Sequence, residues 1–194
     1  MVRDHRGRGM TESEFVKEII EKYTNDEELR ELLIVHSRSV ADKAVKIADE
    51  CGLDVDRQFV YDAAMLHDIG VTKCNAPGIH CHGTLPYICH GIAGSEILCE
   101  EGIDERYRRV CERHTGSGIT ANEIRDNGLP IPVKDYLPET LEEKLICYAD
   151  KFFSKSSNPE VEKDEDRIFR SMQKFGDEAV RRLEELKELF TPKR

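Results

Sequence analysis

Apolar residues recur at helical spacing along most of the chain, and charged residues fill the opposite faces of the same segments. The spacing predicts a helix from Leu29 until Gly52, with His36 on its inner face, and a second helix from about Asp56 to Gly70. Two further helices are expected between residues 90 and 114. This pattern is typical of an all-α fold.

The rest of the chain predicts three more helices and two long loops. Apolar positions after Thr140 form a buried helix that also carries Asp150, and residues 159–190 form two amphipathic helices. Residues 71–89 and 116–139 contain most of the prolines and are expected to be loops, the second a lid or substrate wall. Capping boxes predict helix starts at Thr11–Glu14, Thr24–Glu27, Thr120–Glu123 and Thr140–Glu143.

Composition limits the organisation of the chain. The 194 residues are 39% hydrophobic and 35% charged, which is typical of one helical domain with charged outer faces. We expect residues 1–10 to be a disordered tail, because they are polar and rich in Arg and Gly, and residues 11–194 to be a single domain. The leucine stripe formed by Leu183, Leu186 and Leu189 is expected to serve as core or as a homodimer face.

Charge and cysteine content exclude several classes of function. A net charge of −10 without a basic run argues against long nucleic acid as a partner. The sequence has neither an apolar stretch of about 18 residues that could span a membrane nor the apolar core of a signal peptide. Seven cysteines are expected to be free thiols, so the sequence predicts a cytoplasmic protein without membrane association.

Six polar residues occupy positions at which the pattern predicts burial. They lie on the inner faces or at the ends of five successive helical segments: His36, His67, Asp68, His90, His114 and Asp150. Burying six such groups without partners would cost much free energy, and a metal centre would satisfy them all. The sequence therefore predicts a metal site.

The order His, His-Asp, His, His, Asp resembles the HD-domain superfamily of metal-dependent phosphohydrolases over about residues 30–155. His67-Asp68-Ile69-Gly70 looks like the superfamily's signature, and Tyr148-Ala149-Asp150-Lys151 is similar to its closing segment. The resemblance implies a single compact HD-domain helical bundle, followed here by the C-terminal helices of about 159–190.

The resemblance also implies a ligand set. His36, His67, Asp68 and Asp150 would hold one ion, and His90 and His114 a second, with Asp68 as the bridge. His90-Gly91 and His114-Thr115-Gly116 are similar to the six-ligand branch that cleaves symmetrical diadenosine tetraphosphate. Two divalent transition-metal ions are therefore expected, with iron or manganese favoured by the resemblance and zinc, cobalt or nickel compatible with the ligand types.

The chemistry of such a site suits a small phosphorylated substrate, a nucleotide being the first expectation. Four neutral imidazoles and two carboxylates carry a formal charge of −2, so two divalent ions leave about +2 to attract phosphate. A metal-activated hydroxide would attack phosphorus, with Asp68 as the bridging catalytic residue. Lys73 follows the His-Asp pair and is predicted to contact phosphate, as a lysine near the pair does in several branches of the superfamily.

Several alternatives remain open. The superfamily also contains di-iron oxygenases with a similar ligand series, and a nucleotide-binding protein could keep the metal site without turnover. A cyclic-dinucleotide phosphodiesterase of the HD-GYP type is disfavoured, because no Gly-Tyr-Pro follows the ligands. Cys74, His80, Cys81, His82 and Cys89 gather in one loop, which is expected to cover the active site, while a zinc site there is a weaker alternative.

Overall fold

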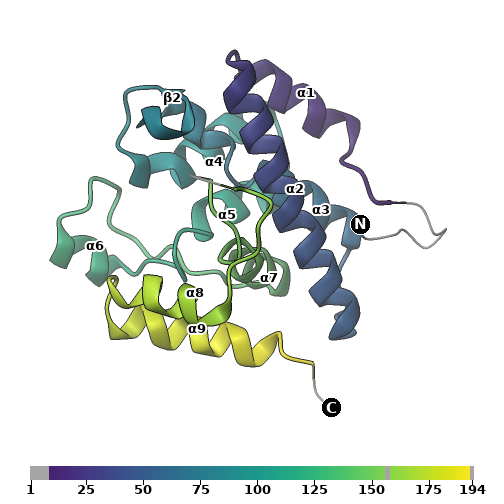
Figure 1. Cartoon of the computed structure of the whole chain (residues 1–194). Helices are drawn as coiled ribbons and strands as arrows, with labels where there is room; N and C mark the ends of the chain where they lie inside the picture. Colours follow the sequence, from purple (N-terminus) through teal and green to yellow (C-terminus); the bar gives the residue numbers. More distant parts are fainter. Residues whose placement is uncertain (1–8, 156–157, 193–194) are drawn as a thin grey trace.

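The computed structural model describes residues 9–155 and 158–192, and this part of the chain is largely helical, which confirms the predicted all-α fold (Figure 1). Its α-helices are α1 (Glu14–Tyr23), α2 (Glu27–Glu50), α3 (Arg57–Leu66), α4 (His90–Glu100), α5 (Glu105–Arg113), α6 (Ala121–Asn127), α7 (Leu141–Asp150), α8 (Glu165–Gln173) and α9 (Asp177–Leu189). None of the helices in this part is both long and apolar enough to span a membrane.

The main core lies where α2, α3 and α7 meet, and α4 packs on α5 beside it. Helices α8 and α9 lie side by side along one edge of the molecule (Figure 1). Leu183 of α9 is fully buried and Leu186 nearly so, which places most of the leucine stripe in the core. Leu189 is 45% exposed on the outer side of α9, so it is not a core residue, and its alternative place in a homodimer face stays a prediction.

Local hydrogen bonds decide where the helices start. The capping boxes at Thr120 and Thr140 are confirmed. The two earlier ones are wrong: α1 starts after Ser13, whose amide and hydroxyl donate to the carboxylate of Asp62. The hydroxyl of Thr24 donates instead to the Ile20 carbonyl at the end of α1, and Asp26 caps α2. A long-range partner, Asp62, therefore displaced the first predicted cap, and neighbouring residues displaced the second.

The two predicted loops contain short regular elements. Within residues 71–89, 3₁₀ turns η1 (Ile69–Lys73), η2 (Pro77–Ile79) and η3 (Tyr87–Cys89) flank strands β1 (Asn75–Ala76) and β2 (Cys81–His82), which pair antiparallel. Within 116–139 the chain forms α6 after its capping box. The predicted tail falls largely on residues 1–8, which lie outside the described residues, whereas Met10 packs against the main core.

Candidate metal centre

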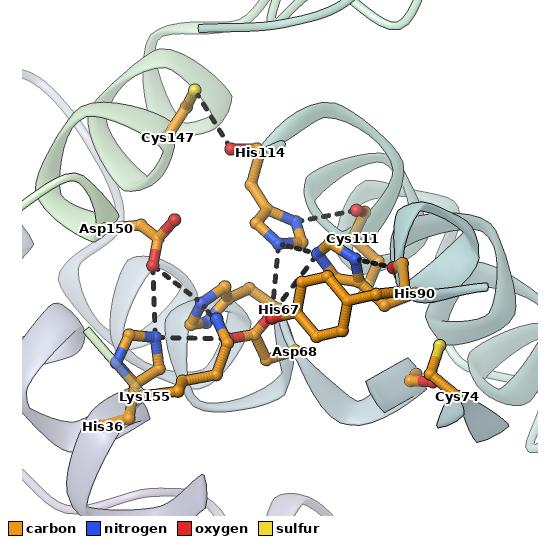
Figure 2. A network of polar contacts seen from close by, with 12 residues as sticks. His36, His67, Asp68, Cys74, His90, Cys111, His114, Cys147, Asp150 and Lys155 are labelled. Carbon is orange, nitrogen blue, oxygen red and sulfur yellow. Dashed lines mark hydrogen bonds and ion pairs between the residues drawn. The ribbon is translucent and has the colours of Figure 1, made fainter. Parts of the chain in front are cut away.

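Helix ends position five of the six predicted polar side chains, and the middle of α2 positions the sixth. His67 caps the C-terminus of α3 and Asp68 follows it, while His114 caps α5. His90 is the first residue of α4, and Asp150 is the last residue of α7. His36 reaches the same place from the middle of α2. All six side chains are buried and point toward one another (Figure 2).

Asp68 lies at the centre of the cluster and divides its two oxygens between two groups. Oδ2 lies 3.2 Å from His36 Nε2 and 3.0 Å from His67 Nε2. Oδ1 lies 3.2 Å from His114 Nε2 and 3.6 Å from His90 Nε2. The first group also includes Asp150, whose Oδ1 is 3.1 Å from His36 Nε2. Each group has the donor atoms and spacing to hold a metal ion.

Backbone carbonyls at helix ends set the tautomers of three of these histidines. Nδ1 of His67, His90 and His114 lies 2.6, 2.7 and 2.8 Å from the carbonyl oxygen three residues earlier in each case. A carbonyl only accepts, so each Nδ1 carries the proton and donates it. The last carbonyls of a helix lack intrahelical partners and are available for this bond. Nε2 of each ring is thereby directed into the cluster and is the nitrogen available to a metal ion.

The nitrogen and oxygen atoms that converge in the cluster are better placed to bind a cation than to hydrogen-bond one another. Nε2 of His90 and Nε2 of His114 lie 3.0 Å apart, and Asp68 Oδ1 lies 3.2 Å from the latter. Three acceptor atoms thus converge at hydrogen-bond distance, an arrangement that a bound cation stabilises. Nε2 of His67 is also buried without a hydrogen bond. The His and Asp residues of this cluster are therefore able to bind metal ions.

The electrostatics keep most ligands in their metal-binding forms. Burial raises the pKa of Asp68, but neighbouring His67 and Lys155 outweigh it and hold that pKa well below its usual range. Burial and the adjacent His114 lower the pKa of His90 to about 3, so its imidazole is neutral. Burial opposes charge on His67, yet Asp68 and Asp150 raise its pKa to about 9. The position of His67 thus favours positive charge.

Two lysines that the sequence analysis did not assign to the site reach the carboxylates. Lys155 Nζ lies 2.6 Å from Asp68 Oδ2. Lys151 Nζ lies 2.9 Å from Asp150 Oδ2 and donates to the carbonyl of His114 at 3.0 Å. Lys151 belongs to the closing segment of the family resemblance, which was a usable signal, whereas Lys155 follows the end of α7, where helical periodicity no longer applies.

Lys73, which the sequence predicts to contact phosphate, forms no hydrogen bond or ion pair with the His and Asp side chains of the cluster, all of which the structure describes. It is the last residue of η1, its side chain is exposed, and its Nζ lies 5.6 Å from the centre of the Tyr23 ring. The cysteine-rich loop also differs from a zinc site: in the described part of the chain, no group of possible ligands includes Cys74, Cys81 or Cys89. His80 of this loop lies 2.9 Å from Glu28 on the surface.

The cluster borders a cavity of about 480 Å³, to which Asp150 contributes. The cavity is lined by three lysines, Lys151, Lys155 and Lys163, and by Tyr87. These ammonium groups give an acidic protein a locally positive entrance to its metal-binding cluster.

The fold and the site define a helical domain with a buried His/Asp centre for metal ions. The HD domain family model matches residues 33–155, which is more than half of the chain, and the protein belongs to the HD domain family. The resemblance seen in the sequence is therefore confirmed.

Three curated proteins are similar to this chain over most of its length. The chain is 46% identical over 124 residues to a tRNA (cytidine(56)-2'-O)-methyltransferase of Picrophilus torridus, covering 64% of this chain and 32% of that protein. The corresponding protein of Thermoplasma volcanium is 38% identical over 122 residues, again with 32% of its length covered. The chain thus spans about a third of these two relatives. An uncharacterised protein of Methanocaldococcus jannaschii is 38% identical over 135 residues, covering 68% of this chain and 72% of that one.

Solved structures agree on the fold. The HD domain of the phosphodiesterase PgpH of L. monocytogenes matches with a TM-score of 0.54 and 17% identity, covering 91% of this chain and 86% of that one. The same domain in complex with cyclic-di-AMP matches with a TM-score of 0.52, 19% identity and coverage of 93% and 86%. At these identities the likeness concerns the fold.

Proposed function

We propose that the protein is a metal-dependent phosphohydrolase that cleaves a phosphoester or phosphoanhydride bond of a small nucleotide. The observation that carries the proposal is the position of Asp68, whose two oxygens face two separate groups of imidazoles. A carboxylate in this position suits a bridge between two ions, one with His36, His67 and Asp150 and the other with His90 and His114.

Mixed imidazole and carboxylate ligands suit iron or manganese, which we propose as the native ions, and also zinc, cobalt or nickel. Bound divalent ions would lower the pKa of a water to about 7 and neutralise charge on the phosphate oxygens. The protein itself contributes the orientation of the ligands, through the carbonyls that hold the imidazoles of His67, His90 and His114.

The lysine-lined cavity supports an anionic substrate. Lys155 is paired with Asp68, and a phosphate group placed over the cluster would offer its ammonium group a second partner. Lys151 and Lys163 line the same cavity, so a substrate with more than one phosphate would meet several positive charges. A net charge of −10 makes this local positive charge necessary for binding an anion.

The comparisons support a nucleotide as substrate class. One solved neighbour is a phosphodiesterase HD domain in complex with cyclic-di-AMP, a small nucleotide. The methyl transfer named for two relatives is not part of the proposal, because the chain spans about a third of each of those proteins. The family match covers residues 33–155, which include the whole buried ligand series of this chain, and that series favours hydrolysis.

The test is hydrolysis by apoprotein reloaded with Mn²⁺ or Fe²⁺, assayed against mononucleotides, cyclic dinucleotides and dinucleoside polyphosphates. Asp68→Asn should abolish turnover. Asp62→Asn is the matched control, since Asp62 is a buried carboxylate that binds Ser13 away from the cluster. Absence of hydrolysis by the loaded protein would reject the proposal. Oxygen uptake with an organic substrate would support the oxygenase alternative, and tight nucleotide binding without product the non-catalytic one.

A further inference from the structure

A second cavity of about 520 Å³ adjoins the lysine-lined one. Its walls are the loop of residues 115–119, helix α6 and the turn between α8 and α9. Gly116, Met172 and Phe175 line both cavities. Together the two cavities form a site with two compartments, only one of which borders the metal-binding cluster.

The two compartments differ in chemistry. Three lysines line the first compartment, whereas the second has a single lysine, Lys174. Six apolar residues contribute to the wall of the second: Ile88, Ile119, Leu129, Met172, Phe175 and Ala179. Several polar side chains in the second wall, those of Ser117, Glu123, Asn127 and Arg182, are engaged within the protein. The hydroxyl of Ser117 donates to the Ala179 carbonyl at 2.7 Å. The guanidinium of Arg182 binds Glu123 at 2.7 Å and the Gly118 carbonyl at 3.0 Å.

Phe175 stands where the compartments meet. It precedes Gly176, whose φ of +95° forms the turn between α8 and α9 in a conformation that favours glycine. Its side chain is 59% exposed, which is unusual for a large apolar residue that borders a cavity. Lys174 Nζ lies 5.1 Å from the centre of the Phe175 ring, and the other face of the ring is available to stack on a flat ring.

We propose that the second compartment binds the nucleobase of the phosphorylated substrate, with Phe175 as its stacking wall. The inference rests on the proposed function, since it assumes that the phosphate lies over the neighbouring lysines. An apolar cavity beside a cationic one matches a molecule that is flat and apolar at one end and anionic at the other. Because Ser117, Asn127 and Arg182 are engaged internally, we expect recognition to rest on stacking and shape more than on hydrogen bonds to the base, so adenine and guanine should bind alike.

The first experiment compares two substrates on the metal-loaded full-length protein. Loss of base stacking on an aromatic residue weakens binding by about 10- to 100-fold. Phe175→Ala should therefore raise KM for a nucleoside triphosphate by this factor while kcat changes little. KM for inorganic triphosphate, which has no base, should not change. Phe175→Tyr should restore the wild-type KM, and Leu189→Ala is the control for loss of an exposed apolar side chain near the C-terminus.

The second experiment does not need turnover. The chain contains no Trp, so Phe175→Trp places a single indole at the shared wall. Adenosine or guanosine, which lack phosphate, should quench its fluorescence on binding.

The inference is overturned if Phe175→Ala leaves KM for the nucleotide unchanged in an enzyme that hydrolyses it, or if neither nucleoside quenches the indole. Quenching by nucleosides in a protein that hydrolyses no nucleotide would reject the proposed function and keep the nucleobase site.

Discussion

Nε2 of His90 and Nε2 of His114 lie 3.0 Å apart, although Nδ1 of each ring already donates to a backbone carbonyl. Two lone pairs at this distance repel each other, and burial lowers the pKa of both rings, so protonation does not readily relieve the repulsion. A metal ion at this place would turn the repulsion into coordination. Whether the site holds one ion or two therefore depends on whether an ion binds at His90 and His114.

We expect the reloaded protein to hold two ions and His90→Ala to hold one. The remaining ion would be bound by His36, His67, Asp68 and Asp150, a group that does not include His90. Metal content after dialysis, measured by inductively coupled plasma mass spectrometry, checks this. His80→Ala, at an exposed position, is the control and should keep both ions. Equal metal content in His90→Ala and the wild type would contradict the two-ion site.

Lys155→Ala should lower kcat/KM by about 10- to 100-fold, since a charge-assisted hydrogen bond to phosphate would be lost. Lys73→Ala is the matched control and should remain within about twofold of the wild type, because its ammonium lies over Tyr23 on the surface. The measurement is steady-state kinetics at saturating metal. A large loss for Lys73→Ala with none for Lys155→Ala would support the assignment made from the sequence.

The different positions of these two lysines show what a sequence pattern can locate. The six His and Asp residues were found because they fall on inner helix faces or at helix ends, where periodicity predicts burial. Lys155 follows the last residue of α7, and no period connects it with Asp68, 87 positions earlier. The contact between Lys155 and Asp68 is long-range and is created only in the folded chain.

The capping boxes show the same limit at the level of local structure. Thr120 and Thr140 cap helices as predicted, because their partners Glu123 and Glu143 lie within the same turn. At the N-terminus the side chain of Asp62, 49 positions away, binds Ser13 and determines the start of α1. A sequence pattern does not contain a partner 49 positions away, so the start of α1 could not be predicted from it.

Glu123 lines the second cavity and contributes to the pH dependence of the free energy of unfolding. Burial raises its pKa, but Arg182 and the amide of Thr120 outweigh this and lower it below 4.5. A lowered pKa in the folded state means that the stabilisation is present above pH 4.5 and is lost as pH falls through the folded value. Glu123→Gln should therefore lower the free energy of unfolding by about 1–2 kcal/mol at pH 7, and less at pH 3.

Urea unfolding at both pH values measures this difference. The control is Glu178→Gln, whose exposed partner is Arg181 and whose removal should have no measurable effect. A difference between wild type and Glu123→Gln that grows toward low pH would contradict the assigned sign.

Gly70, the last residue of the His67–Gly70 signature, should not tolerate a side chain. A Cβ at this position would lie 2.0 Å from the carbonyl oxygen of His90 and 2.2 Å from the amide nitrogen of Gly94. Both are backbone atoms of α4, so the whole helix, with the His90 imidazole, would have to shift. Gly70→Ala should thus lower the free energy of unfolding by about 1–3 kcal/mol or more and weaken binding of the ion at His90 and His114.

Gly78→Ala is the matched control, because a Cβ there meets no heavy atom within 4 Å and its φ is not positive. Urea unfolding and metal content are measured on both variants. If Gly70→Ala unfolds at the same urea concentration as Gly78→Ala and keeps both ions, then the close contact between η1 and α4 does not position His90. Close packing of α4 against η1 would then not explain why glycine stands at position 70.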